Sequence, residues 1–214
     1  MGLVAQNFDF LLKGAYYTLY ITIVSMFFGF FLALILAIAR LKGNLLISSI
    51  ARVYVSIFRG TPILVQIFIV YFGLPDYGIK FGPLTAACVA LSLNIAAYLS
   101  ETFRGAIVSV SKGQTEAALS LGLSPWQTMR RIVLPQAARV AIPPMGNTFI
   151  GILKETSLVS IVTVTELLRS AQLLIANYYI AMPFYIAIAI MYWIMSLVFS
   201  AILNRIEDNL SRAY

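Results

Sequence analysis

Polar side chains inside long apolar stretches are the residues of this 214-residue sequence best suited to chemistry. Asn94 and Tyr98 are four residues apart, so this pair shares one face of a helix, as do Thr148 and Glu155, seven residues apart. Because polar groups inside a bilayer cost free energy, we predict a mid-membrane cavity lined by Thr61, Gln66, Asn94, Tyr98, Asn147, Thr148, Glu155 and Ser157. Hydrogen bonds between helices are the alternative explanation for the same residues.

Several other kinds of site are disfavoured by what the sequence lacks. It contains no histidine, so metal sites and acid–base catalysis lose their commonest residue, and we expect neither a metal site nor a bound cofactor. The single cysteine, Cys88, can form no internal disulfide and lies in an apolar stretch, which indicates a small buried side chain. The apolar stretches contain no aspartate and no paired acids. An intramembrane enzyme, with catalytic residues of its own, is therefore disfavoured.

The composition places the chain in a membrane. Hydrophobic residues make up 61% of it and charged residues 11%, with a mean hydropathy of +0.91. About 20 uncharged residues match the hydrocarbon core, and charge-free stretches run over 14–39, 81–100 and 170–204. We predict an all-α integral membrane fold, a single transmembrane domain over 1–214, with about five spans at 14–39, 60–75, 83–101, 140–163 and 183–204.

The distribution of basic residues predicts the orientation of these spans. If the N-terminus lies outside, the inner loops and the C-terminal tail hold 11 of the 15 Lys and Arg residues, and the outer segments hold three. Positive charge favours the cytoplasmic side, so we expect the N-terminus outside and the C-terminus inside. The net charge of +7 then needs no nucleic acid partner.

One inner loop, about 105–139, has the pattern of a folded element. Residues 114–121 read as a short helix that Gly122 ends, because glycine readily adopts the left-handed conformation. Ser124 is placed to cap a second helix that starts at Pro125, with Gln127 closing a capping box. Pro135 is expected to end the regular part. The alternative is an amphipathic connector that lies on the lipid surface.

This loop also carries a family resemblance. The pattern E-A-A-x3-G-x9-I-x-L-P is met by Glu116, Ala117, Ala118, Gly122, Ile132, Leu134 and Pro135. It resembles the EAA motif of permease subunits in bacterial binding-protein-dependent ABC importers, where it contacts the ATPase. The segments 59–62, 93–98 and 146–157 resemble polar amino acid permeases, and the segment 125–139 is most like cystine permeases.

The resemblance implies a type I importer fold in the bacterial cytoplasmic membrane and a set of partners. These are a second permease subunit, identical or not, cytoplasmic ATPase subunits that bind ATP and magnesium, an extracytoplasmic amino acid-binding protein, and membrane lipid. The chain has no phosphate-binding G-x-x-x-x-G-K-[ST] loop of its own.

The expected substrate is a polar amino acid, cystine or glutamine first. Glu155 would meet its ammonium group, and donors such as Thr61, Asn94 and Ser157 would meet its carboxylate. Basic amino acids such as arginine or histidine, or a channel or scaffold that is not an ABC protein, are the alternatives.

Overall fold

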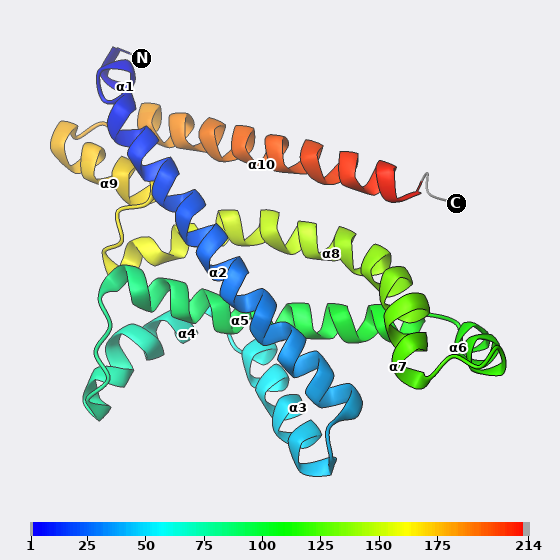
Figure 1. Cartoon of the computed structure of the whole chain (residues 1–214). Coiled ribbons are helices and arrows are strands. Elements are labelled where there is room, and N and C mark those ends of the chain that lie inside the picture. Colours follow the sequence, from blue (N-terminus) through cyan, green and yellow to red (C-terminus); the bar gives the residue numbers. More distant parts are fainter. Residues whose placement is uncertain (1, 212–214) are drawn as a thin grey trace.

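The computed structural model describes residues 2–211, and every regular element in that range is helical. Figure 1 shows the long helices lying side by side, with short helices at both ends of the bundle. The elements are α1 (Gly2–Gln6), α2 (Phe8–Lys42), α3 (Leu45–Gly60), α4 (Ile63–Phe68), the π-helix η1 (Ile69–Gly73), the 3₁₀-helix η2 (Leu74–Tyr77), α5 (Pro83–Ser109), α6 (Lys112–Ser120), α7 (Pro125–Thr128), the π-helix η3 (Met129–Val133), α8 (Leu134–Glu155), the 3₁₀-helix η4 (Thr156–Val162), α9 (Leu167–Tyr178) and α10 (Met182–Ser211).

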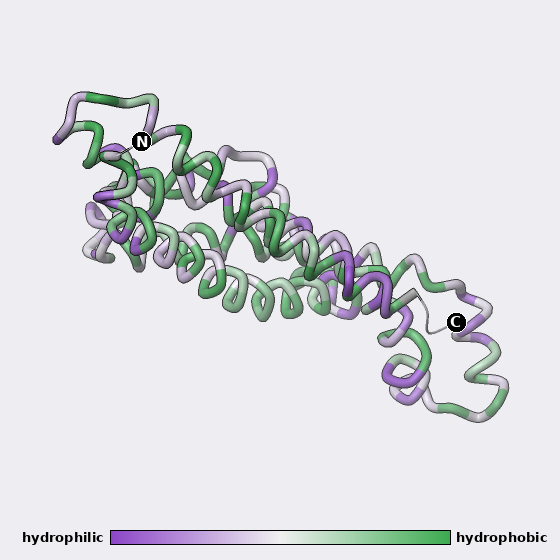
Figure 2. Tube along the Cα trace, turned by 90° about the horizontal axis from the view of Figure 1, so that it is seen from above, coloured by the Kyte–Doolittle hydropathy of each residue, from purple (hydrophilic) through white to green (hydrophobic). Residues whose placement is uncertain are grey.

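Helices α2, α5 and α10 are each long and apolar enough to cross a membrane. Two bent pairs of segments also pass this test, 45–60 with 63–77 at a bend of 107° and 125–162 with 167–178 at a bend of 47°. If each bent pair is one span, the described residues hold up to five spans, the number predicted from the sequence. In Figure 2 the long helices are mostly hydrophobic, and several hydrophilic segments lie near the end that carries the C-terminus.

The central contact of the bundle joins α2 to α5, and small side chains make it possible. Many of the buried residues of α2 are small and recur every three or four positions; the first of them pack against α9, and Ser25, Gly29, Ala33 and Ala37 follow toward the C-terminal end. A Cβ atom added at Gly29 would lie 2.6 Å from Cγ2 of Ile95 on α5. Small residues let two helix backbones approach closely. In a bilayer the lipid is as apolar as the side chains, so helices associate through this close packing rather than through the hydrophobic effect.

Helix α3 is the main element that the span assignment missed. The predicted spans 14–39 and 60–75 leave an inner loop between them, but residues 45–60 form an amphipathic helix. Asn44 caps its N-terminus, accepting a hydrogen bond of 2.9 Å from the backbone N–H of Ile47. The helix ends at Gly60, before Thr61 and Pro62, both with extended backbone dihedral angles. Ala51 and Val55 of this helix are buried, whereas most of its larger apolar side chains are exposed.

The expectation that Pro135 ends the regular structure is wrong. The chain passes from α7 through the π-helical turn of η3 into α8, which continues to Glu155. In that turn the Leu134 N–H bonds to the Met129 carbonyl, five residues back. A widened turn of this kind makes room for the proline ring. It also lets the helix continue although Pro135 has no N–H to donate.

Candidate functional site

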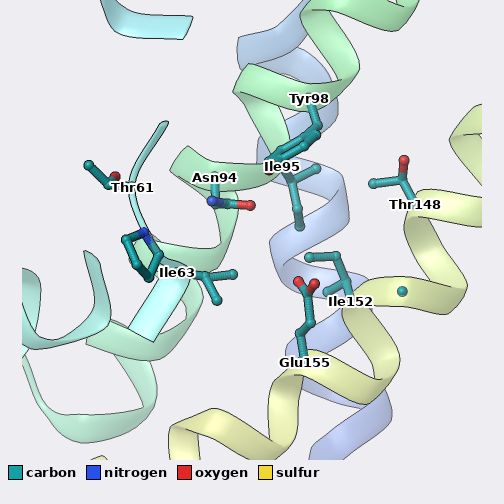
Figure 3. Close-up of a pocket in the computed structure, with 10 residues that line it drawn as sticks. Thr61, Ile63, Asn94, Ile95, Tyr98, Thr148, Ile152 and Glu155 are labelled. Atoms are coloured by element: carbon teal, nitrogen blue, oxygen red, sulfur yellow. The ribbon is translucent and has the colours of Figure 1, made fainter. Parts of the chain in front are cut away.

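A cavity of about 360 Å³ lies where the α3–α4 junction, α5 and α8 meet. Figure 3 shows side chains from all three directions pointing into it. Its lining is Thr61, Pro62, Ile63, Asn94, Ile95, Tyr98, Thr148, Gly151, Ile152 and Glu155. Five of the eight predicted pocket residues are thus brought together, from three segments that are far apart in the sequence.

The other three predicted residues do not line this cavity. Gln66 is buried behind it, with 5% of its surface exposed. Asn147 is exposed. It precedes Thr148 by one residue, so its side chain leaves the helix about 100° away from the face that lines the cavity. The Ser157 hydroxyl donates to the Lys154 carbonyl at 2.8 Å, so its hydrogen serves its own chain.

Gln66 instead fixes the bend between α3 and α4. Its Nε2 donates to the Phe58 carbonyl at 2.9 Å, to the Thr61 carbonyl at 3.1 Å and to the Thr61 hydroxyl at 2.9 Å. Its Oε1 accepts from Nδ2 of Asn94 at 3.0 Å. Carbonyl oxygens can only accept, so these partners determine which end of the Gln66 amide is nitrogen. A buried amide therefore ties the wall of the cavity to α5.

The same network determines what Asn94 presents to the cavity. Its Nδ2 donates both to Gln66 and, at 3.3 Å, to the Phe58 carbonyl. If the Asn94 amide were turned over, its oxygen would face two other oxygen atoms, the Phe58 carbonyl and Gln66 Oε1. Both hydrogens of Nδ2 are therefore used within the protein, and Oδ1 is left for the cavity. Figure 3 shows the nitrogen on the side of Thr61 and the oxygen on the opposite side, toward α8. Asn94 therefore offers the cavity an acceptor.

The two threonine hydroxyl groups of the lining also donate their hydrogens within the protein. Thr61 donates to the Ile57 carbonyl at 2.8 Å, and Thr148 donates to the Pro144 carbonyl at 2.9 Å. Both keep only acceptor capacity toward the cavity. Glu155, the last residue of α8, adds a carboxylate that Figure 3 shows pointing inward. The lining is thus rich in acceptors, which suits an ammonium or amide group.

This arrangement disfavours the prediction that Thr61, Asn94 and Ser157 donate hydrogen bonds to a substrate carboxylate. Their donor hydrogens are all engaged within the protein. The sequence showed which residues face the cavity on a helix, but not which side of each polar group remains available.

Two other polar clusters join helices outside the cavity. Glu101 on α5 forms ion pairs with Arg104 on the same helix and with Arg40 near the end of α2. Glu166, fully buried, was not singled out from the sequence. It accepts hydrogen bonds of 2.8 Å from the backbone N–H groups of residues 168 and 169, capping α9, and from the Tyr192 hydroxyl on α10. Within the described residues no group of three His, Cys, Asp or Glu side chains could hold a metal ion.

The inner loop has the predicted pattern of helix, glycine turn and helix. Helix α6 covers 112–120, and Gly122 follows it with φ of 82°. Ser124 and Gln127 form the capping box, with the Gln127 N–H bonded to the Ser124 hydroxyl at 3.2 Å and the Ser124 N–H bonded to Gln127 at 2.9 Å. In Figure 1, α6 and α7 lie at one end of the bundle, beyond the long helices that they connect. The loop is therefore presented where a partner can reach it.

Comparison with known proteins gives a consistent result. The chain is 44% identical over 212 residues to the L-cystine transport system permease protein TcyB of Bacillus subtilis, which covers 98% of the chain and 91% of that protein. It is 41% identical over 199 residues to the glutamine transport system permease protein GlnP of Escherichia coli, and this match covers 92% of the chain and 91% of GlnP. A probable amino-acid ABC transporter permease protein of Bacillus subtilis, YckA, is 45% identical over 205 residues, covering 96% and 91%.

The fold matches solved transporters as well. The crystal structure of an amino acid ABC transporter with histidines superposes with a TM-score of 0.92 at 34% identity, with 96% of each chain covered. The MetNI methionine ABC transporter, at 22% identity and a TM-score of 0.79 over 96% of this chain and 98% of that one, shares the fold. Residues 25–212 match the family described as binding-protein-dependent transport system inner membrane component. The chain is a multi-pass membrane protein that belongs to this family of ABC importer permeases.

Proposed function

We propose that this subunit carries a polar amino acid inward through the cavity between the α3–α4 junction, α5 and α8. The observation that carries the proposal is the pair of acceptors, Asn94 Oδ1 and the Glu155 carboxylate, that face a cavity of about 360 Å³. An ammonium group that leaves water needs such partners. The cystine and glutamine transport proteins, at 44% and 41% identity, favour those two substrates, whereas the amino acid ABC transporter with histidines, at 34% identity, supports the alternative of a basic amino acid.

The inner loop would supply the connection to the motor. Glu116, Ala117 and Ala118 lie on α6, and the turn at Gly122 and the segment through Ile132 to Pro135 lead into α8. Since α8 contributes Thr148 and Glu155 to the cavity, movement of the loop by a bound ATPase would be transmitted to the cavity wall. A second permease subunit and an extracytoplasmic binding protein complete the proposed assembly.

Uptake by proteoliposomes that contain the complete importer tests this function. With ATP inside and the binding protein outside, we expect cystine or glutamine to accumulate. Glu155→Gln, which keeps the shape and removes the charge, should reduce uptake at least about tenfold, the loss expected for a charge-assisted hydrogen bond. Glu207→Gln, the same change on α10 near the C-terminus, is the matched control. Undiminished uptake by Glu155→Gln, or a preference for arginine over both substrates, would overturn the proposal.

The proposed orientation has a separate test. With Cys88 replaced by alanine, single cysteines at Lys80 and at Lys112 should react with an impermeant thiol reagent from opposite sides of the membrane. These positions lie at the two ends of α5, just before Pro83 and just after Ser109. Labelling of both from one side would refute the orientation.

A further inference from the structure

None of the residues that line the cavity carries a positive charge that could meet the carboxylate of a free amino acid. Its acceptors can meet the ammonium group, but the amide hydrogens of Asn94 and the hydroxyl hydrogens of Thr61 and Thr148 are engaged elsewhere. This leaves the neutral Tyr98 hydroxyl as the uncommitted side-chain donor of the lining. A carboxylate that leaves water without donors costs several kcal/mol. If the proposed function holds, a cation at the edge of the cavity would supply the positive charge that the lining lacks.

Arg59 is the cation that the structure places at this edge. It lies in the last turn of α3, two residues before Thr61. Its guanidinium group lies over the ring of Tyr98, with Cζ 5.4 Å from the ring centroid, and Tyr98 lines the cavity. Among residues 2–211, no Asp or Glu forms an ion pair with Arg59. Its donors are therefore available to a ligand.

The other nearby cation is less well placed. Lys154 precedes Glu155 on α8, so its side chain leaves the helix about 100° away from the face that lines the cavity. Like Arg59 it is exposed and outside the lining, but of the two only Arg59 is held over the ring of a lining residue, Tyr98. A flexible ammonium group also lacks the planar fork with which arginine binds a carboxylate through two hydrogen bonds.

We propose that Arg59 binds the α-carboxylate of the transported amino acid and that Tyr98 holds the guanidinium group in place. This inference rests on the proposed function. It fixes the orientation of the substrate, with its ammonium group at Asn94 and Glu155 and its carboxylate at Arg59. Tyr98, four residues after Asn94 on one face of α5, lies next to Arg59. An arginine can stack its face on an aromatic ring and still offer its edge to a carboxylate.

A binding measurement without the binding protein tests this, because that protein makes its own selection. The purified permease–ATPase complex in nanodiscs is titrated with L-glutamine and L-cystine, and with the α-amide of glutamine and the bis-α-amide of cystine, in which neutral amides replace the α-carboxylates. Arg59→Gln should weaken binding of the amino acid about 10- to 100-fold. Binding of the α-amide should change less than about twofold. Arg59→Lys, which keeps the charge but loses the fork, should lie between.

Arg52→Gln is the matched control. Arg52 lies seven residues earlier on the same face of α3, and bonds to its own helix through Ser48 and Ser49. This variant should bind all four compounds as the wild type does. Equal losses for amino acid and α-amide in Arg59→Gln, or no loss for either, would overturn the role of Arg59. If binding also survives Glu155→Gln unchanged, the cavity itself is not the substrate site and the proposed function fails with it.

Discussion

Replacing Gln66 with leucine should loosen the bend between α3 and α4. The substitution keeps the approximate volume but removes the two amide hydrogens that three acceptors share, and one accepted bond. The Phe58 carbonyl retains Asn94 at 3.3 Å, whereas the Thr61 carbonyl loses its bond from Gln66. At about 1 kcal/mol net for each buried bond, and more for a group left unpaired, we expect a loss of about 2–4 kcal/mol.

The assay is thermal unfolding of the purified complex, compared with Gln172→Leu on α9. The Gln172 side chain accepts a single bond, from Arg169 at 3.4 Å, so this control should leave the midpoint nearly unchanged. Gln66→Leu should lower the midpoint clearly and also weaken glutamine binding, because Thr61 and Asn94 lose their alignment.

A double-mutant cycle separates this network from general damage to packing. With Asn94→Leu already present, the additional loss from Gln66→Leu should be smaller by about 1 kcal/mol, since the bond between the two amides is gone in both members of that comparison. Strict additivity, or an unchanged midpoint in Gln66→Leu alone, would refute the idea that this amide holds the bend.

Three further predictions concern single positions. Gly29→Ala should destabilise the complex by about 1–3 kcal/mol because its Cβ would clash with α5, whereas Gly105→Ala, with nothing within 4 Å, should be neutral or slightly stabilising in the same thermal assay. Gly122→Val should cost about 1–3 kcal/mol through backbone strain alone, since φ is 82° and a Cβ added there would meet no atom within 4 Å. Uptake by this variant should fall, while its insertion into the membrane persists. Glu166→Gln should lower the unfolding midpoint, because one of the N–H groups that cap α9 must then face an amide donor; a midpoint equal to that of the wild type would contradict this.

Local properties of the sequence determined the membrane class and the inner loop. A span needs only an uncharged stretch of sufficient length, and the α6–α7 turn needs only a glycine, a capping serine and a glutamine at fixed spacing. The pairing of Asn94 with Tyr98, and of Thr148 with Glu155, also followed from helical geometry. These predictions required no knowledge of distant contacts.

Tertiary structure alone decided how the polar groups are used. The 107° bend exposes carbonyl groups at the end of α3, and these fix the direction of the Gln66 amide and leave Asn94 with an acceptor for the cavity. Arg59 reaches Tyr98 only because α3 ends beside α5. Hydrogen-bond direction depends on partners far apart in the chain, so the sequence could name these residues but could not tell which end of each polar group remains available.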